Sequence, residues 1–493
     1  MSSEENGIES YKEQLDLFTA QISKLSKITE LIASGKFFFY HPKINVEDDH
    51  PILLLVKNFN QMVANIKEYQ ENLEEKVQER TKELEEKNKE LSELFEKVND
   101  LKKQQDGDYF LTSLLLEPLG QNKSEQNNVK IEFLIQQKKR FTFKNKEHSI
   151  GGDICGANTI KLRGKKHTVF FAADAMGKSI QGAGGALVLG ALFEAIINRT
   201  QQSEKIQNSY PEIWIRDSIT EIQTVFESFD GLMLMSLLVG LIDNQTGLVY
   251  TVSFDYPTPV LYRGREASYI MQYSYFSKIG IASDFFLFDG NETNEGLPLY
   301  INLFNLQDGD SLFAGSDGKD DLFLGQDGLN NRIINSDDNL FLRVIKNSHG
   351  ELKEIYNTLK KNGEFIDDVS LMKVSYKRPF EKKTIVMNAH TKKALAVFKN
   401  FFLERAYKKA EKEIVKAYKL GYTNPKVFKY LAKVYYELKL YKRAAYFAKY
   451  YYKLKPIDSD NIKILADSYK KLGKIEEAVE LSAVLIFRLR NVP

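Results

Sequence analysis

The sequence predicts an α+β protein in which a central region of strands and helices is flanked by regions that are helical only. Apolar side chains recur in heptads from Phe59 to Leu101, the pattern of a long coiled-coil helix. Short runs rich in β-branched and aromatic residues then alternate with helical patterns as far as Lys377. After Pro379 the pattern is helical and repeats with a period of about 34 residues. These observations predict four domains, at residues 1–58, 59–107, 108–378 and 385–493.

The first domain is expected to be helical. Residues 8–35 have the spacing of an amphipathic helix, with Leu15 and Ile22 on its apolar stripe. Gly35 and Pro42 interrupt this pattern, and a second helix is expected to begin near Pro51. The order of helix, connector and helix, with the segment NFNQMVANI, resembles part of a HAMP signalling module. A plain helical hairpin gives the same pattern, so both interpretations of residues 1–58 stay open.

The heptads predict a parallel, two-stranded coiled coil that holds the protein as a homodimer. The alternative is one solvated helix that lies on its own domain, but such a narrow stripe buries little within a monomer. Gln70, Arg80 and Lys87 break the seam, so only moderate stability is expected. The helix is expected to stop near Asp106 and Gly107, before a short connector helix. The core positions are Val63, Val77, Leu84, Leu91 and Val98, and Phe59, Ile66, Leu73, Leu94 and Leu101.

The composition is that of an ordinary globular protein, with 43% hydrophobic residues and a formal net charge of +2. The charge is uneven, because the part from Glu381 onward carries an excess of roughly 15 positive charges. Cys155 is the only cysteine, which excludes an intramolecular disulfide and suggests a reducing compartment; a packing role is favoured over chemistry. We expect a cytoplasmic protein with no membrane span and no nucleic-acid partner.

Four isolated aspartates mark the central region. Asp153 follows SIGG, Asp174 begins DAMGK, Asp317 lies in SDG and Asp367 begins DDVSL. Each stands at the edge of an expected strand, where a turn or cap residue is the ordinary interpretation. Taken together, oxygen ligands without a Cys and His cluster favour Mg²⁺ or Mn²⁺ over zinc. The six histidines are scattered and show no ligand spacing.

In this order the four motifs resemble the sporulation protein E (SpoIIE) type phosphatases, the bacterial branch of the protein phosphatase 2C (PPM) superfamily. The likeness covers roughly residues 108 to 376 and includes a central hairpin from Met233 to Arg263. It implies an α-β-β-α sandwich with two antiparallel sheets between helices. It also implies a protein-serine/threonine phosphatase whose usual substrate is a phosphoserine on a small anti-sigma factor antagonist.

The resemblance further implies a ligand set for two ions, Mn²⁺ or Mg²⁺. Asp153 and Asp174 would bridge or hold them, the carbonyl of Ala175 would add a ligand, and Asp317 and Asp367 would complete the shell. A water activated by the two ions would attack the phosphate ester, without a covalent enzyme intermediate. The neighbouring Asp320, Asp321 and Asp368 are not included in this set. The rival interpretation is a degenerate phosphatase fold that serves only as a signalling scaffold.

The sequence departs from the family pattern in two places. The residues Phe254 to Pro257 replace a usual asparagine, alanine, glycine and histidine run. Gly156 stands where an aspartate is common, three residues after Asp153. Both departures surround the expected ligands without altering them, so we expect them to bear on substrate recognition and rate.

The C-terminal region resembles tetratricopeptide repeats. Three positions align at the repeat period, the first of them occupied by Ala410, Ala444 and Ala478. Such helical hairpins bury their apolar faces only by stacking, and three is the minimum for a stack. The excess of lysine predicts a protein partner with an acidic or extended segment.

Overall fold

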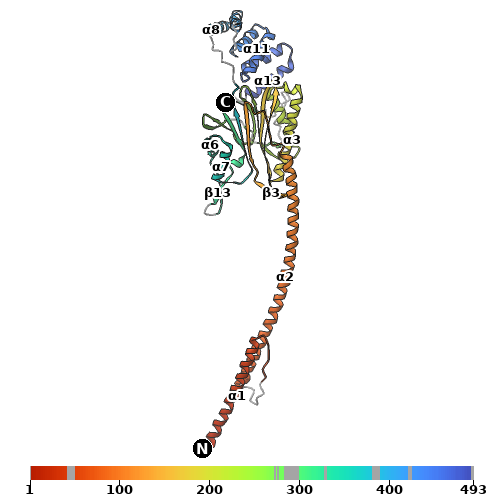
Figure 1. Ribbon diagram of the computed structural model, residues 1–493, viewed down its shortest axis with the longest axis vertical. Helices are drawn as coiled ribbons and strands as arrows, with labels where there is room; N and C mark the ends of the chain where they lie inside the picture. Colours follow the sequence, from red (N-terminus) through yellow and green to blue (C-terminus); the bar gives the residue numbers. More distant parts are fainter. Residues whose placement is uncertain are drawn as a thin grey trace. The chain divides into compact units, whose positions relative to one another are not determined.

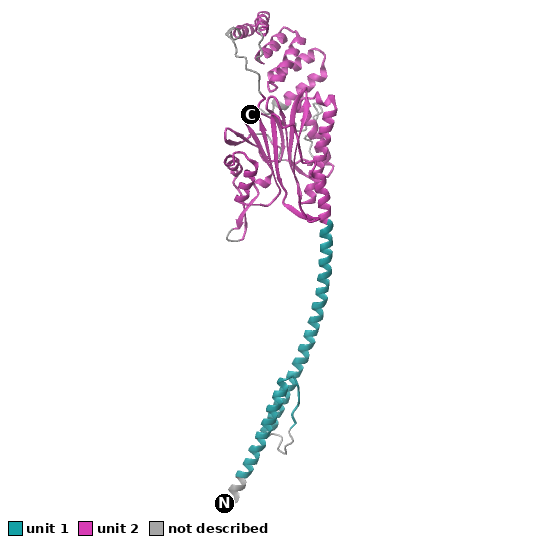
Figure 2. Ribbon diagram, viewed as in Figure 1, with its two compact units in different colours: residues 1–104 teal, residues 105–493 magenta. Residues whose placement is uncertain are grey.

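The computed structural model describes residues 2–41, 50–270, 274, 277–281, 299–326, 330–379, 389–419 and 425–489. The chain divides into two compact units, Met1–Gln104 and Gln105–Pro493 (Figure 2). Each unit is described by itself. The four-domain division expected from the sequence stays a prediction.

The first unit is a helical hairpin with an extended connector. It contains α1 (Ser2–Ala33) and most of α2 (Pro51–Leu116). Leu25 of α1 and Ile52, Val56 and Val63 of α2 are buried. The Asn60 side chain holds the connector, because its Oδ1 accepts from the Tyr40 N–H and its Nδ2 donates to the Tyr40 carbonyl, each at 2.7 Å. This agrees with the expected helix, connector and helix, and the HAMP likeness stays a prediction.

The helix α2 continues without a break through Gly107, so the expected stop near Asp106 is wrong. One helical glycine costs only about 1 kcal/mol relative to alanine. Packing on the hairpin of β3 (Lys139–Phe143) and β4 (Lys146–Ile150) offsets that cost. Tyr109 meets Phe141 edge to face at 5.6 Å, and Phe110 stacks on Phe143 at 4.4 Å between ring centroids.

The central part of the second unit is a sandwich of two sheets (Figure 1). In the described residues the first sheet has the order β1-β5-β6-β7-β8-β11 and the second β10-β9-β12-β16-β2. Among the described residues, the strand pairings within these two sheets are antiparallel except that of β1 with β5. The first sheet contains β1 (Asn122–Lys123), β5 (Asp153–Leu162), β6 (Lys165–Ala175), β7 (Met235–Asp243), β8 (Leu248–Phe254) and β11 (Asn302–Asn305). The second contains β2 (Val129–Gln136), β9 (Val260–Arg263), β10 (Glu266–Tyr269), β12 (Ser311–Gly315) and β16 (Val369–Tyr376).

Alternation along the strands builds the layers, as β6 illustrates. Val169, Phe171 and Ala173 join the core beneath the helices, whereas Phe170 and Ala172 join the core between the two sheets. Both faces of this strand are therefore buried, which explains its continuous apolar run. Cys155 is buried in the same inter-sheet core, in agreement with the packing role expected for it.

Helices cover both outer faces, which confirms the α-β-β-α sandwich. The helices α3 (Ile180–Gln202) and α5 (Pro211–Glu227) pack on the first sheet, and α6 (Leu340–Asn347) and α7 (Leu352–Asn362) pack on the second. The helices α6 and α7 are separated at Gly350, where φ is +71°. A small additional sheet holds β13 (Leu322–Gln326), β14 (Arg332–Ile334) and β15 (Glu364–Phe365).

Among the described residues, α3 alone is long and apolar enough to cross a membrane by length and composition. This differs from the expectation that no apolar stretch approaches that length. Half of the most apolar 18-residue stretch of α3 is buried within the protein. Its residues Ala186, Leu189 and Phe193 pack in the core beneath the first sheet.

The C-terminal region consists of helices that follow one another as three hairpins. They are α8 (Ala389–Leu403) with α9 (Tyr407–Lys419), α10 (Pro425–Glu437) with α11 (Tyr441–Leu454), and α12 (Ser459–Lys471) with α13 (Ile475–Leu489). The aligned Ala410, Ala444 and Ala478 are all buried, as small residues at close helix contacts must be. The assignment as tetratricopeptide repeats stays a prediction.

Candidate functional site

Two neighbouring strands bring Asp153 and Asp174 together. Asp153 begins β5, Asp174 lies near the end of β6, and the antiparallel register pairs the two residues directly. Side chains of directly paired residues lie on the same face, with Cβ atoms about 5 Å apart. The two carboxyl groups that the sequence singled out are therefore immediate neighbours.

Asp153 is buried, with 3% of its surface exposed. Its Oδ2 accepts a 2.7 Å hydrogen bond from the Ser316 hydroxyl, which in turn accepts from the Ser370 N–H at 3.0 Å. Its Oδ1 is also buried and accepts no hydrogen bond from any described residue. A buried carboxylate oxygen without a partner is costly and points to a missing positive group.

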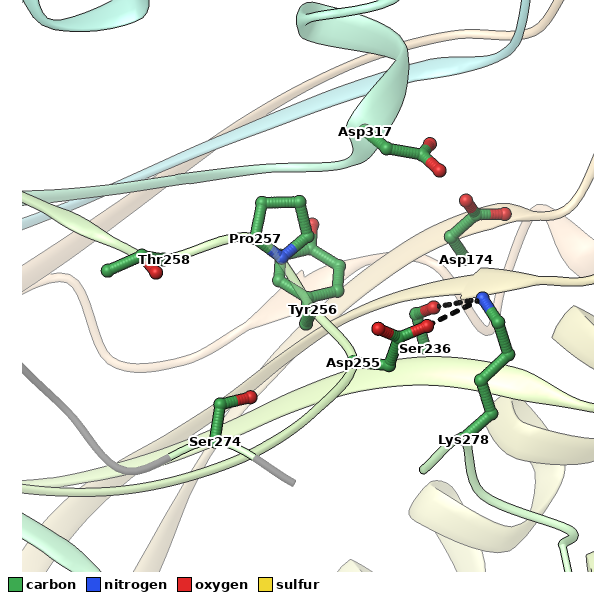
Figure 3. Close-up of a pocket in the computed structure, with 9 residues that line it drawn as sticks. All are labelled: Asp174, Ser236, Asp255, Tyr256, Pro257, Thr258, Ser274, Lys278 and Asp317. Atoms are coloured by element: carbon green, nitrogen blue, oxygen red, sulfur yellow. Dashed lines mark hydrogen bonds and ion pairs between the residues drawn. The ribbon is translucent and has the colours of Figure 1, made fainter. Parts of the chain in front are cut away.

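Asp317 follows strand β12 of the second sheet, and its carboxyl group lies beside that of Asp174, with both residues lining one cavity (Figure 3). It begins the short 3₁₀ helix η2 (Asp317–Lys319), directly after β12 and Ser316. Burial raises the pKa of Asp174 well above its usual range, and the charges of Asp153, Asp317 and Asp367 raise it further. Burial also raises the pKa of Asp153. The site therefore gathers more negative charge than its surroundings neutralise.

The pair Asp367 and Asp368 approaches this cluster from the segment before β16. Asp367 is exposed, and its Oδ1 accepts from the Asp368 N–H at 2.9 Å. Asp368 accepts from the N–H of Gly152 at 2.9 Å and from that of Lys138 at 2.6 Å. Sequence reasoning left Asp368 out of the site, yet its hydrogen bonds tie the second sheet to the segment that holds Asp153. Its doubled aspartate was the available signal.

Two glycines allow backbone segments near the carboxylates to approach one another closely. A Cβ on Gly152 would lie 2.4 Å from the Ala175 carbonyl oxygen, and one on Gly318 would lie 1.9 Å from the Asp368 carbonyl oxygen. Neither distance is possible for a real side chain, and backbone atoms cannot rotate away. Glycine is therefore required at both positions by close approach.

A cavity of about 370 Å³ opens beside Asp174 and Asp317 (Figure 3). Lys278 is the only basic side chain among the described residues that line it. Nothing in the sequence FSKIG distinguished this lysine, so sequence reasoning missed it. The lining residues are Asp174, Ser236, Asp255, Tyr256, Pro257, Thr258, Ser274, Lys278 and Asp317.

The cluster has the donor chemistry for hard divalent cations. The candidate ligands predicted from the sequence are carboxylate and carbonyl oxygens, the ligands that Mg²⁺ and Mn²⁺ prefer. The unpartnered Asp153 Oδ1 and the raised pKa of Asp174 are the features that bound cations would relieve. Within the described residues no three His, Cys, Asp or Glu side chains converge as a ready metal-binding group.

The two departures from the family pattern have structural counterparts. A Cβ on Gly156 would lie 2.4 Å from the ring of Phe171, which is completely buried, so an aspartate there requires repacking of the core. Asp255 has a φ of +45°, a left-handed conformation that aspartate tolerates better than most residues. Asp255 and Tyr256 also line the cavity, which puts this departure at the site itself.

Residues 164–377 match the family model described as stage II sporulation protein E (SpoIIE). This region is a SpoIIE-family domain. The domain is homologous to the protein phosphatase 2C-type serine/threonine phosphatases, which are hydrolases. The matched residues include Asp174, Asp317 and Asp367, whereas Asp153 lies before them.

Solved structures similar to the chain include the RsbU and RsbW domains of a protein from Mycobacterium tuberculosis. That structure shares 14% identity over 59% of this chain and 73% of its own, with a TM-score of 0.37. The phosphatase domain and regulatory fragment of SpoIIE from Bacillus subtilis shares 18% identity over 51% of this chain and 64% of its own, with a TM-score of 0.34. RsbX in complex with magnesium shares 14% identity over 52% and 99%, with a TM-score of 0.32. No curated protein sequence matches the chain.

Proposed function

We propose that the protein is a metal-dependent phosphatase that hydrolyses phosphoserine or phosphothreonine esters on a protein in bacterial signalling. The observation that carries the proposal is the cluster of Asp153, Asp174 and Asp317 at one edge of a SpoIIE-family domain, beside an open cavity. Isolated carboxylates do not gather in this way for stability, because their repulsion and desolvation destabilise the folded state.

In this proposal Asp153, Asp174, Asp317 and Asp367, with the carbonyl of Ala175, hold two divalent ions. The ions would neutralise charge on the phosphoryl oxygens and activate a water for attack. The chain itself positions these groups. The Ser316 hydroxyl fixes the Asp153 carboxylate by a hydrogen bond. Gly152 allows the close approach of the Ala175 backbone, and Gly318 that of the Asp368 backbone. The oxygen ligands admit both Mn²⁺ and Mg²⁺.

The substrate we propose is a phosphorylated protein, by family likeness an anti-sigma factor antagonist. The cavity beside Asp174 is open, which suits a phosphorylated side chain presented on a protein surface. The helical hairpins after residue 388 would dock a protein partner, and their excess of positive charge supports an acidic one. We place this activity in the cytoplasm.

We also propose that α2 forms a parallel coiled coil with a second copy of the chain. Its heptad residues Leu73, Leu84 and Leu91 are each more than 60% exposed, and Val77 and Leu94 are more than half exposed. An apolar stripe of this length on a single helix favours a partner helix, even with its polar breaks at Gln70, Arg80 and Lys87.

The second candidate function is a non-catalytic scaffold. The observations that favour it are the exposed position of Asp367, the absence of a convergent group of three ligands among the described residues, and the unusual segment at Asp255. In this alternative the SpoIIE-family domain binds a phosphoprotein without hydrolysing it.

One experiment separates the two functions. Purified protein is incubated with a phosphoserine peptide and with a small aryl phosphate, in Mn²⁺, in Mg²⁺ and in chelator. We expect release of phosphate that requires the metal and that is lost in Asp317→Asn. Activity that persists in chelator would refute the metal-dependent mechanism. Protein that binds Mn²⁺ without releasing phosphate would support the scaffold.

A further inference from the structure

The geometry points to Lys278 as the phosphate-binding residue of the site, an inference that rests on the proposed function and deepens it. The four aspartates among the proposed metal ligands are negative, and a phosphate monoester is itself a dianion. A site that binds it needs positive charge from the chain as well as from the ions. Lys278 supplies the only such charge among the described residues of the cavity.

The position of the ammonium group follows from strand register. Asp153, Asp174 and Ser236 are successive cross-strand partners on β5, β6 and β7. The Lys278 Nζ donates a 2.7 Å hydrogen bond to Ser236 Oγ (Figure 3). The ammonium group is therefore bound to the residue directly beside Asp174, at the edge of the carboxylate cluster.

The backbone of Lys278 is held in place by its successors in the chain. Ile279 forms a β-bridge with Met235, through hydrogen bonds of 2.9 and 3.1 Å in the two directions. The Gly280 N–H donates to Gln223 Oε1 at 3.0 Å, and the positive φ of Gly280, +94°, turns the chain there. Met235 precedes Ser236, so the same strand fixes both the backbone near Lys278 and the side chain that its ammonium group meets.

The contacts of Lys278 leave it available to a ligand. Its Nζ lies 3.2 Å from Asp255 Oδ2, in a pair whose side chains are 28% and 43% exposed. Ion pairs at such exposure contribute little to stability, so the pair alone does not explain an anchored lysine. Ser236 and Asp255 occupy two of the three ammonium N–H donors, and the third can meet a phosphoryl oxygen.

We infer separate roles for Asp255 and Lys278 from this arrangement. Asp255, in its left-handed conformation, keeps the ammonium group oriented over the cavity, and the ammonium group binds a phosphoryl oxygen of the substrate. The ligand class is a phosphate monoester dianion or its product, inorganic phosphate. Lys278 should therefore act on phosphate affinity and not on metal affinity, which distinguishes it from the aspartates.

The test compares the wild-type protein with Lys278→Gln and Lys278→Arg. The matched control is Lys346→Gln, because Lys346 pairs with Glu266 at 2.8 Å on α6 and β10 and does not line the cavity. Two quantities are measured in saturating Mn²⁺: kcat/KM for a phosphoserine peptide, and the dissociation constant of inorganic phosphate by calorimetry. Mn²⁺ affinity and thermal unfolding without phosphate check that the site and the fold remain.

We expect Lys278→Gln to weaken phosphate binding and to lower kcat/KM by about 10- to 100-fold, the effect of losing one charge-assisted hydrogen bond. Lys278→Arg should retain most of the phosphate affinity and most of kcat/KM, and Lys346→Gln should match the wild type in both quantities. Unchanged phosphate binding in Lys278→Gln would overturn the inference even in an active enzyme. If the wild type shows no hydrolysis, the proposed function fails, while the phosphate-binding comparison still decides the role of Lys278.

Discussion

The Ser316 hydroxyl donates a 2.7 Å hydrogen bond to Asp153, and this contact joins the two sheets of the sandwich at the candidate site. Ser316 directly follows β12 of the second sheet, and Asp153 begins β5 of the first. A hydrogen bond to a buried, charged acceptor is among the stronger polar contacts in a protein.

Ser316→Ala should therefore lower the free energy of unfolding by about 1–3 kcal/mol, because both oxygens of Asp153 would then lack a donor. Urea unfolding in chelator measures this change. Ser375→Ala is the matched control, because its hydroxyl meets only that of Ser311, at 3.0 Å. A larger effect in the control than in Ser316→Ala would contradict the importance of the inter-sheet contact.

Asp174→Asn should abolish metal-dependent hydrolysis and yet stabilise the metal-free protein at pH 8. The pKa of Asp174 is raised by folding from about 3.8 to about 9. Its ionisation therefore opposes folding, and stability is lost as the pH rises through that window. Removal of the ionisable group should raise stability at pH 8 by at least about 1 kcal/mol, with no gain near pH 4.

Thermal unfolding of the wild type and of Asp174→Asn in chelator at pH 4 and pH 8 tests this expectation, followed by Mn²⁺ addition. The midpoint of the wild type should rise with Mn²⁺ by more than that of Asp174→Asn. If the wild type and Asp174→Asn were equally stable without metal at both pH values, folding would not raise the pKa of Asp174.

Gly318→Ala should destabilise the domain by about 1–3 kcal/mol and disrupt the site, because the new Cβ would meet the Asp368 carbonyl. Gly184→Ala in α3 is the control. Its Cβ would have only Met233 nearby, at 3.6 Å, so it should be neutral or slightly stabilising. Denaturant unfolding of both variants gives the comparison, and a tolerated Gly318→Ala would argue against the close backbone approach.

Leu84→Lys in α2 should dissociate the proposed dimer, because it puts a charge in the centre of the coiled-coil seam. Light scattering of the full chain across a concentration series measures the mass. Glu85→Lys, one residue along the helix and off the seam, should leave the mass unchanged. A monomeric wild type would refute the coiled coil, and a dimer unaffected by Leu84→Lys would move the interface elsewhere.

The strands that could be predicted from the sequence are those rich in β-branched and aromatic residues. The runs rich in β-branched and aromatic residues at Leu248–Phe254 and Val260–Arg263 are the strands β8 and β9. By contrast β5 was not predicted, because Cys155, Gly156 and Asn158 weaken its pattern. Its strand character comes from pairing with β6, a tertiary interaction that local propensity does not record.

The motif order singled out carboxylates that the structure brings together, whereas their role as a site stays a prediction. Asp153 and Asp174 are paired across two strands, and Asp317 lies beside Asp174. Lys278 could not be found in this way, because a lone lysine becomes informative only when register brings Ser236 beside Asp174. The role of Ser316 could not be predicted either, because its hydrogen-bond partner Asp153 lies 163 residues away in the chain.

The unbroken passage of α2 through Gly107 has a mechanical consequence. The last turns of the helix hold the aromatic side chains of the β3–β4 hairpin, and only Gly151 and Gly152 separate the end of β4 from Asp153. Helix, hairpin and first carboxylate are thus connected in series. A rotation or shift of the final helical turns would pull directly on the residue that starts β5. We therefore expect a displacement of the helical turns around Tyr109 to reach the site through only a few residues.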